Sequence, residues 1–133
     1  MEENLSEYSL EKLKNAFSKL SEGAKIADDD LYRDGVIQRF EFTFELLWKT
    51  IKIYLENQGI IVRSPRESFK EAFRLNIIEN EKLFLDMLKD RNDTTHIYDK
   101  ETAESIFNRI KENYIPAIKG VLKNLGQHYS AFK

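Results

Sequence analysis

Arg91, His96 and Tyr98 lie in the eight-residue segment RNDTTHIY and form the clearest candidate site in the sequence. An arginine binds phosphate through its guanidinium N–H groups, a histidine transfers protons near neutral pH, and a tyrosine hydroxyl can donate, accept or be modified. This set suits a phosphodiester or a nucleotide, and Asn92 could contact the same ligand. The alternative is structural: Arg91 caps a helix, His96 fills a turn, and Tyr98 packs on the core.

The spacing of Arg91 and His96 limits how they can act together. Five positions apart on a continuous α-helix, two side chains point about 140° away from each other. They share a ligand only if the helix ends between them, or if each works with its counterpart from a second copy of the chain. The Asn, Asp and Thr residues at 92–95 favour a helix end, because their side chains compete for backbone hydrogen bonds. We therefore predict a composite site at a two-fold axis.

The helix that must organise the core follows Gly35 and runs to about Asn57. At 100° per residue, one wide apolar face contains Val36, Ile37, Phe40, Phe44, Leu47, Trp48, Ile51, Tyr54 and Leu55. Phe42, Leu46 and Ile53 lie almost opposite this face. A small monomer has no reason to make both faces apolar, so we predict a homodimer whose interface contains these three residues.

The remaining helical patterns complete a bundle. Apolar residues at steps of three and four predict a first helix over residues 9–27. The capping box Ser64-Pro65-Arg66-Glu67 begins a short helix that ends near Asn76, and a fourth helix around residues 83–88 ends at RNDTT. Asp99 is the expected N-cap of a last helix over residues 100–125, which Gly126 closes and Pro116 kinks without ending. These elements predict an all-α fold: an up-and-down four-helix-type bundle with one extra short helix.

Length and composition limit the possible functions. A chain of 133 residues forms one domain, with flexible ends expected at 1–8 and 127–133. Lys+Arg (21) nearly balance Asp+Glu (23), so no net positive field attracts nucleic acid. There are no cysteines and only two histidines, so we expect neither a metal site nor a cofactor. We find no signal peptide pattern and no apolar run of about 20 residues, and therefore expect a cytoplasmic protein without membrane contact.

Two sets of residues resemble known families. The segment RNDTTHIY fits the R-x4-6-H motif of the HEPN superfamily, and in its R-x4-H-x-Y form it resembles the HepT-type members. The stretches RDGVIQRFEFTFELLWKTIKIYLENQG and SPRESFKEAF resemble the nucleotidyltransferase substrate-binding proteins, small helical relatives that pair with a separate minimal nucleotidyltransferase. The matching stretches extend from about Asp34 to Leu125.

The resemblance implies a homodimeric bundle whose partner chain carries the catalytic Gly-Ser and paired aspartates of the nucleotidyltransferase fold. In one reading, this chain binds a nucleotide or another substrate through Arg91, Asn92, His96 and Tyr98 in the dimer cleft. In the alternative reading, it is a metal-independent ribonuclease toxin of a toxin and antitoxin pair. Arg91 and His96 would then act on RNA, and the partner would neutralise the toxin by adding AMP to Tyr98.

Overall fold

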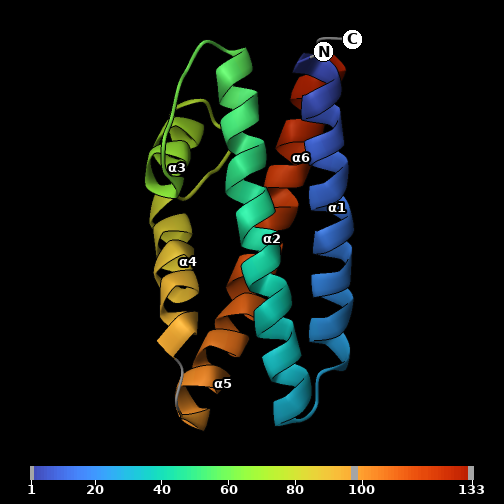
Figure 1. The fold of residues 1–133 in the computed structure, drawn as a ribbon, viewed down its shortest axis with the longest axis vertical. Helices are drawn as coiled ribbons and strands as arrows, with labels where there is room; N and C mark the ends of the chain where they lie inside the picture. Colours follow the sequence, from blue (N-terminus) through green and yellow to red (C-terminus); the bar gives the residue numbers. More distant parts are fainter. Residues whose placement is uncertain (1, 97–98, 132–133) are drawn as a thin grey trace.

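The computed structural model describes residues 2–96 and 99–131, with side-chain detail for residues 6–95 and 99–127. The elements are α1 (Glu2–Ile26), α2 (Asp30–Asn57), α3 (Pro65–Arg74), α4 (Glu81–Asp93), the 3₁₀ turn η1 (Thr94–His96), α5 (Lys100–Arg109), the π-helical turn η2 (Ile110–Tyr114) and α6 (Ile115–Ala131). The helices α1 and α2 are antiparallel, α3 and α4 make the third arm, and α5, η2 and α6 make the fourth (Figure 1). The predicted four-helix-type bundle is confirmed.

Side-chain caps fix where four of the helices begin. In each case a side-chain oxygen accepts the backbone N–H three residues ahead: Asp29 from Tyr32, Ser64 from Glu67, Asn80 from Leu83 and Asp99 from Thr102. The predicted caps Ser64 and Asp99 are therefore confirmed. The N–H and hydroxyl of Thr102 also lower the pKa of the Asp99 carboxyl. The capping box differs in one detail, because Glu67 accepts the N–H of Arg63 instead of that of Ser64.

The first two helices begin earlier than predicted: α1 begins at Glu2 and not at residue 9, and α2 begins at Asp30 and runs unbroken through Gly35. The fourth arm also differs from its prediction. The helix continues through Gly126 to Ala131, so the predicted closure at Gly126 was wrong. A glycine ends a helix when it adopts a positive φ, and among the glycines of the described residues only Gly59 does so. The C-terminal residues 127–131 are helical, and the flexibility of the chain ends stays a prediction.

Pro116 leaves the arm unbroken, and a π-helical turn precedes it. Proline has no N–H and its ring crowds the carbonyl four residues earlier, which an ordinary α-helix does not tolerate. In η2 the chain widens by one residue, so that the N–H of Ile115 bonds to the carbonyl of Ile110. The fourth arm therefore passes through the proline without ending.

The core lies along one face of α2, as predicted. All the apolar residues assigned to that face are buried except Trp48, which is half-buried against the core. A chain of ring contacts links Phe40, Phe44, Phe69 and Phe84 and so connects α2 to the third arm. Two buried threonines, Thr43 and Thr50, were absent from the predicted face; their hydroxyls lie 3.4 Å and 3.3 Å from carbonyl oxygens of α1.

None of the helices within the described ranges has both the length and the apolar character needed to cross a membrane.

Candidate functional site

The last turn of α4 carries Arg91 and Asn92, and the α-helix ends shortly after them at Asp93. The hydroxyl of Thr94 donates to the carbonyl of Arg91 at 2.6 Å, and that of Thr95 donates to the carbonyl of Asn92 at 3.1 Å. The chain continues as the 3₁₀ turn through His96. The helix end that cooperation between Arg91 and His96 requires is thus present, and it arises from the competing Thr side chains as predicted.

The Arg91 guanidinium lies between α4 and α2. Its Nη2 donates to Glu45 Oε1, its Nη1 donates to Asn92 Oδ1 at 3.1 Å, and its Cζ lies 5.5 Å from the centre of the Phe44 ring. The side chains of Arg91 and Glu45 are each 33% exposed. Arg91 therefore has one face on an aromatic ring and an edge open to solvent, and an incoming anion must compete with Glu45 for it.

Glu45 is itself held by α2. Its Oε2 accepts the indole N–H of Trp48 at 3.3 Å and lies 3.7 Å from the ammonium of Lys49. These contacts orient the carboxylate toward Arg91 without a further helix. The sequence spacing of Glu45 and Arg91, 46 residues, gave no sign of this pair.

The structure describes only some of the predicted partners of Arg91. The side chain of His96 and the residue Tyr98 lie outside the described residues. The site formed by Arg91, Asn92, His96 and Tyr98 therefore stays a prediction, of which the structure places Arg91 and Asn92.

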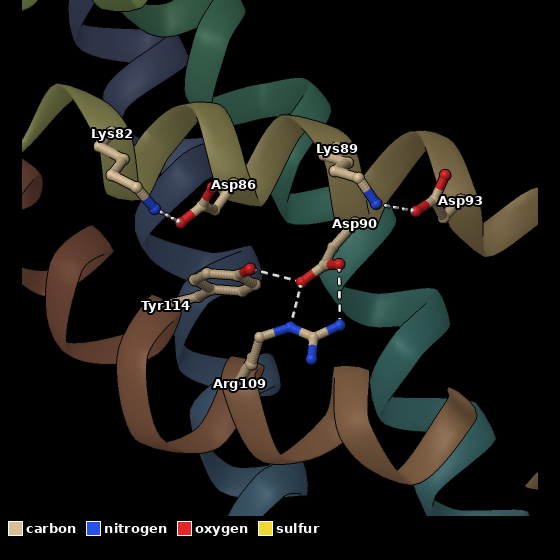
Figure 2. A network of polar contacts seen from close by, with 7 residues as sticks. All are labelled: Lys82, Asp86, Lys89, Asp90, Asp93, Arg109 and Tyr114. Atoms are coloured by element: carbon tan, nitrogen blue, oxygen red, sulfur yellow. Dashed lines mark hydrogen bonds and ion pairs between the residues drawn. The ribbon is translucent and has the colours of Figure 1, made fainter. Parts of the chain in front are cut away.

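Asp90 forms a buried polar cluster on the side of α4 that faces the fourth arm (Figure 2). Its side chain accepts two bonds from Arg109, at 2.7 Å from Nε and 2.9 Å from Nη2, and a third from the hydroxyl of Tyr114. Asp90 is only 5% exposed and Tyr114 only 1%. The Tyr114 ring stacks on Phe40, with the ring centres 5.6 Å apart. This cluster joins α4 to the fourth arm through the core.

The environment of the cluster changes its acid and base properties. Burial, together with the hydrogen bond to Asp90, raises the pKa of the Tyr114 hydroxyl well above its usual value. The hydrogen bond to Asp90 likewise raises the pKa of Arg109. Tyr114 is therefore a neutral donor to Asp90 throughout the physiological pH range.

The spacing of Tyr114 places it on the apolar stripe of the last helix, so the sequence pattern gave no sign of the cluster. Arg109 and Tyr114 are five positions apart, which on an α-helix would point them about 140° away from each other. In a π-helical turn the repeating bond runs from i to i+5, so residues with this spacing come to the same side. Two features of the sequence could have indicated the cluster. Pro116 lies inside a helical pattern, and Tyr114 lies at a core position where its hydroxyl needs a hydrogen-bond partner.

An open groove of about 460 Å³ lies where α2 begins and η1 follows α4. It is lined by Leu31, Asp34, Gly35, Ile37, Gln38, Glu41 and Thr94. Carboxylate and amide groups alternate there with apolar ones, so the groove offers hydrogen-bond acceptors and apolar contacts. None of these lining residues has a cationic side chain that could bind a phosphate. Within the predicted site, Arg91 could supply that charge, and it lies three residues before Thr94 in the chain.

The predicted dimer residues lie on the outer side of α2. Phe42 is 60% exposed, whereas Leu46 is half-buried and packs against the core. Ile53 is also half-buried. Phe42 and Leu46 border a groove of about 240 Å³ between α1 and α2, which basic side chains of both helices also line. The interface stays a prediction, for which Phe42 is the most accessible residue.

Comparison with solved structures finds similar folds, among them the following two. A solved structure from Thermus thermophilus has a TM-score of 0.79 and 35% identity, over 85% of this chain and 98% of that one. A structure from Haemophilus influenzae, described as the fold of a substrate binding domain of a nucleotidyltransferase, has a TM-score of 0.68 and 23% identity, over 92% of this chain and 98% of that one. The second likeness shows the fold alone.

A curated relative and a family match bear on the sequence as a whole. The probable ribonuclease HepT of Haemophilus influenzae is 30% identical over 83 residues, which are 59% of this chain. This chain thus spans just over half, 57%, of that relative's length. Residues 8–127 match the family described as nucleotidyltransferase substrate binding protein like. Since this match extends over most of the chain, the protein belongs to the nucleotidyltransferase substrate binding protein-like family.

Proposed function

We propose that this chain is the substrate-binding subunit of a two-protein nucleotidyltransferase, in which a separately encoded minimal nucleotidyltransferase carries out the chemistry. The observation that carries the proposal is the family match over residues 8–127. The sequence also contains no Gly-Ser pair, and its Asp-x-Asp pair, Asp28 and Asp30, lies at the start of α2 and not on a strand. A cytoplasmic location, where both proteins would meet a nucleotide, belongs to the same proposal.

In this proposal the end of α4 binds the phosphates of a nucleotide. Arg91 presents a guanidinium that is pre-oriented by Phe44 and Asn92 and open to solvent at one edge. The groove of about 460 Å³ that Thr94 lines, three residues after Arg91, is large enough for part of a small molecule, and its acceptors suit the hydroxyl and amino groups of a sugar or base. His96 and Tyr98 would complete the site.

The test measures nucleotide binding by the purified chain alone and together with a minimal nucleotidyltransferase, which we would seek in the adjacent reading frame. We expect the two proteins to co-purify, and Arg91→Ala to weaken ATP binding at least tenfold by calorimetry. Lys89→Ala is a matched control, because Lys89 lies two residues away on the outer face of α4, paired with Asp93. Equal ATP affinity of Arg91→Ala and wild type would refute the role of Arg91.

A homodimer through Phe42, Leu46 and Ile53 belongs to the same proposal, because a two-fold axis would bring two copies of the site together. Phe42→Glu is the sharper test, since Phe42 is exposed whereas Leu46 also packs against its own core. Sedimentation of the wild type should give about twice the chain mass, and Phe42→Glu should sediment as a monomer with unchanged helix content. A monomeric wild type at micromolar concentration would remove the composite site.

A second candidate is a metal-independent ribonuclease, favoured by the relative named probable ribonuclease HepT and by the intact Arg91, His96 and Tyr98 set. RNA cleavage in EDTA should then occur with wild type and be lost in His96→Ala. Incubation with the partner and ATP should add the mass of AMP to Tyr98, as mass spectrometry would detect. Equal cleavage by wild type and His96→Ala would exclude this candidate.

A further inference from the structure

The buried cluster of Asp90, Arg109 and Tyr114 is difficult to explain by stability alone. Burying the Asp90 carboxylate costs desolvation energy that its ion pair with Arg109, whose side chain is 42% exposed, offsets only in part. Replacing a buried ion pair with apolar residues of similar volume is often neutral or stabilising. Asp90 is 5% exposed and lies beside the aromatic core through Tyr114 and Phe40. Apolar groups in place of Asp90 and both of its partners would suit the same core, so the cluster needs a reason beyond packing.

The geometry of α4 supplies one. Asp90 and Arg91 are neighbours, and neighbouring residues on an α-helix point about 100° apart. When Asp90 is fastened to the fourth arm, Arg91 is directed toward α2, where it meets Glu45 and Phe44. Three directional bonds fix the rotation of the helix about its axis in a way that an apolar contact, which is non-directional, does not.

The outer side of the same helix has no comparable anchor among the residues that the structure describes. The pairs Lys82–Asp86 and Lys89–Asp93 run along the exposed face of α4 and connect α4 only to itself (Figure 2). Exposed pairs of this kind contribute little. Apart from the apolar side chains of α4 that pack in the core, the last turn of α4 is therefore held by Asp90 and by the contacts of Arg91 itself.

The anchor is set by the π-helical turn that precedes Pro116. This turn brings Arg109 and Tyr114, five residues apart, to the same carboxylate. π-helical turns of this type occur frequently at functional sites. The contacts of Asp90, which is the neighbour of Arg91 in the chain, thus extend to the π-helical turn before Pro116.

We propose that Asp90, Arg109 and Tyr114 are positioning residues that fix the last turn of α4 so that Arg91 projects against Glu45 and Phe44. The functional meaning of this inference rests on the proposed role of Arg91 as the phosphate-binding group. The structural part of the inference does not depend on that role, because the direction of the Arg91 side chain can be measured without a ligand.

The decisive variant replaces the whole cluster by apolar groups, with Asp90→Leu, Arg109→Leu and Tyr114→Phe combined. The readout is the side-chain Nε–H signal of Arg91 in nitrogen-15 NMR spectra of the full chain, recorded with and without Glu45→Gln. In wild type, Glu45→Gln should shift the Arg91 signal, because the two side chains are in contact. In the apolar variant the same substitution should leave the signal unchanged, while urea unfolding shows a folded bundle.

Two further variants keep the test decisive. Tyr114→Phe alone keeps the ring that stacks on Phe40, removes one of the three bonds, and should shift the Arg91 signal partway. Lys89→Ala, on the outer face of α4, should leave the signal and its response to Glu45→Gln as in wild type. The proposal is overturned if Glu45→Gln shifts the Arg91 signal as much in a folded apolar variant as in wild type. If the apolar variant does not fold, the same result in Tyr114→Phe overturns it.

A functional arm separates this inference from the proposed function. Tyr114→Phe should weaken ATP binding about threefold or more, and Lys89→Ala should not. If the Arg91 signal moves while ATP binding is absent even in wild type, the positioning role stands and the proposed function fails. If ATP binding is weakened but the Arg91 signal does not move, the positioning role is refuted.

Discussion

The hydroxyl of Tyr114 should stabilise the fold by an amount that depends on pH. Tyr114→Phe removes a hydrogen bond to a buried carboxylate but keeps the ring that stacks on Phe40. Hydrogen bonds to charged groups contribute about 1.5 to 3 kcal/mol, and Asp90 retains both bonds from Arg109, so we expect the lower value, about 1.5 kcal/mol at pH 7. Wild type should be more stable than Tyr114→Phe by this amount.

The difference should vanish near pH 11. In the unfolded chain a tyrosine ionises with a pKa of about 10, whereas burial raises the pKa of Tyr114 in the folded protein. Above pH 10 the unfolded state therefore binds fewer protons than the folded state, and the free energy of unfolding falls as the pH rises. At pH 11 this loss is about 1.4 kcal/mol, because an unfolded pKa of about 10 leaves roughly one unfolded molecule in eleven protonated.

Urea unfolding followed by circular dichroism at 25 °C, at pH 7 and pH 11, measures both values. The lysines and the other five tyrosines titrate in both proteins, so they cancel in the comparison. Tyr32→Phe is the matched control, since Tyr32 is exposed and should make no difference at either pH. An equal wild-type advantage at pH 7 and pH 11, or none at pH 7, would refute the assignment of a buried hydrogen bond between Tyr114 and Asp90.

Three further outcomes follow from single contacts. Glu45→Gln removes the carboxylate that competes for Arg91, so inorganic phosphate should bind up to about fivefold more tightly by calorimetry. This factor corresponds to about 1 kcal/mol, the value for a partly exposed ion pair. Weaker phosphate binding by the variant would contradict this prediction. Ser68→Ala should raise the stability measured by urea unfolding by about 1 kcal/mol, because the buried Ser68 hydroxyl has no hydrogen-bond partner among the residues that the structure describes, and a lower urea midpoint would contradict this. Phe69→Ala should cost about 3 to 5 kcal/mol, because Phe69 is fully buried between Phe44 and Phe84; a loss below about 1 kcal/mol would show that the core closes over the gap.

The local features of this chain could be predicted from its sequence because their causes are local. A cap such as Asp99 acts on an N–H three residues ahead, and the core face of α2 follows from a repeat of three and four residues. Both depend on neighbours along the chain. The end of α4 belongs to the same group, because the hydroxyls of Thr94 and Thr95 bond to carbonyls three residues behind them.

Local rules were wrong or incomplete at Gly126 and at Glu67. Gly126 is a residue type that commonly ends a helix, yet α6 continues through it. Glu67 has the position of a capping-box residue but accepts a different N–H from the one that the pattern specifies. In each case the residue type permits more than one conformation, and the sequence motif does not select between them.

The candidate site shows the same division. The residue types in RNDTTHIY indicated a phosphate-binding group and its position, because Arg91 is a guanidinium wherever it lies. Its partners were decided by the tertiary structure: Glu45 is 46 residues away along the chain, and Asp90 meets Arg109 and Tyr114 across 19 and 24 residues. The spacing rule for an α-helix even argues against Arg109 and Tyr114 acting together, and only the π-helical turn reverses it. Sequence thus determined which groups are available, whereas packing of separate arms determined which of them meet, because hydrogen bonds form between atoms close in space and not in sequence.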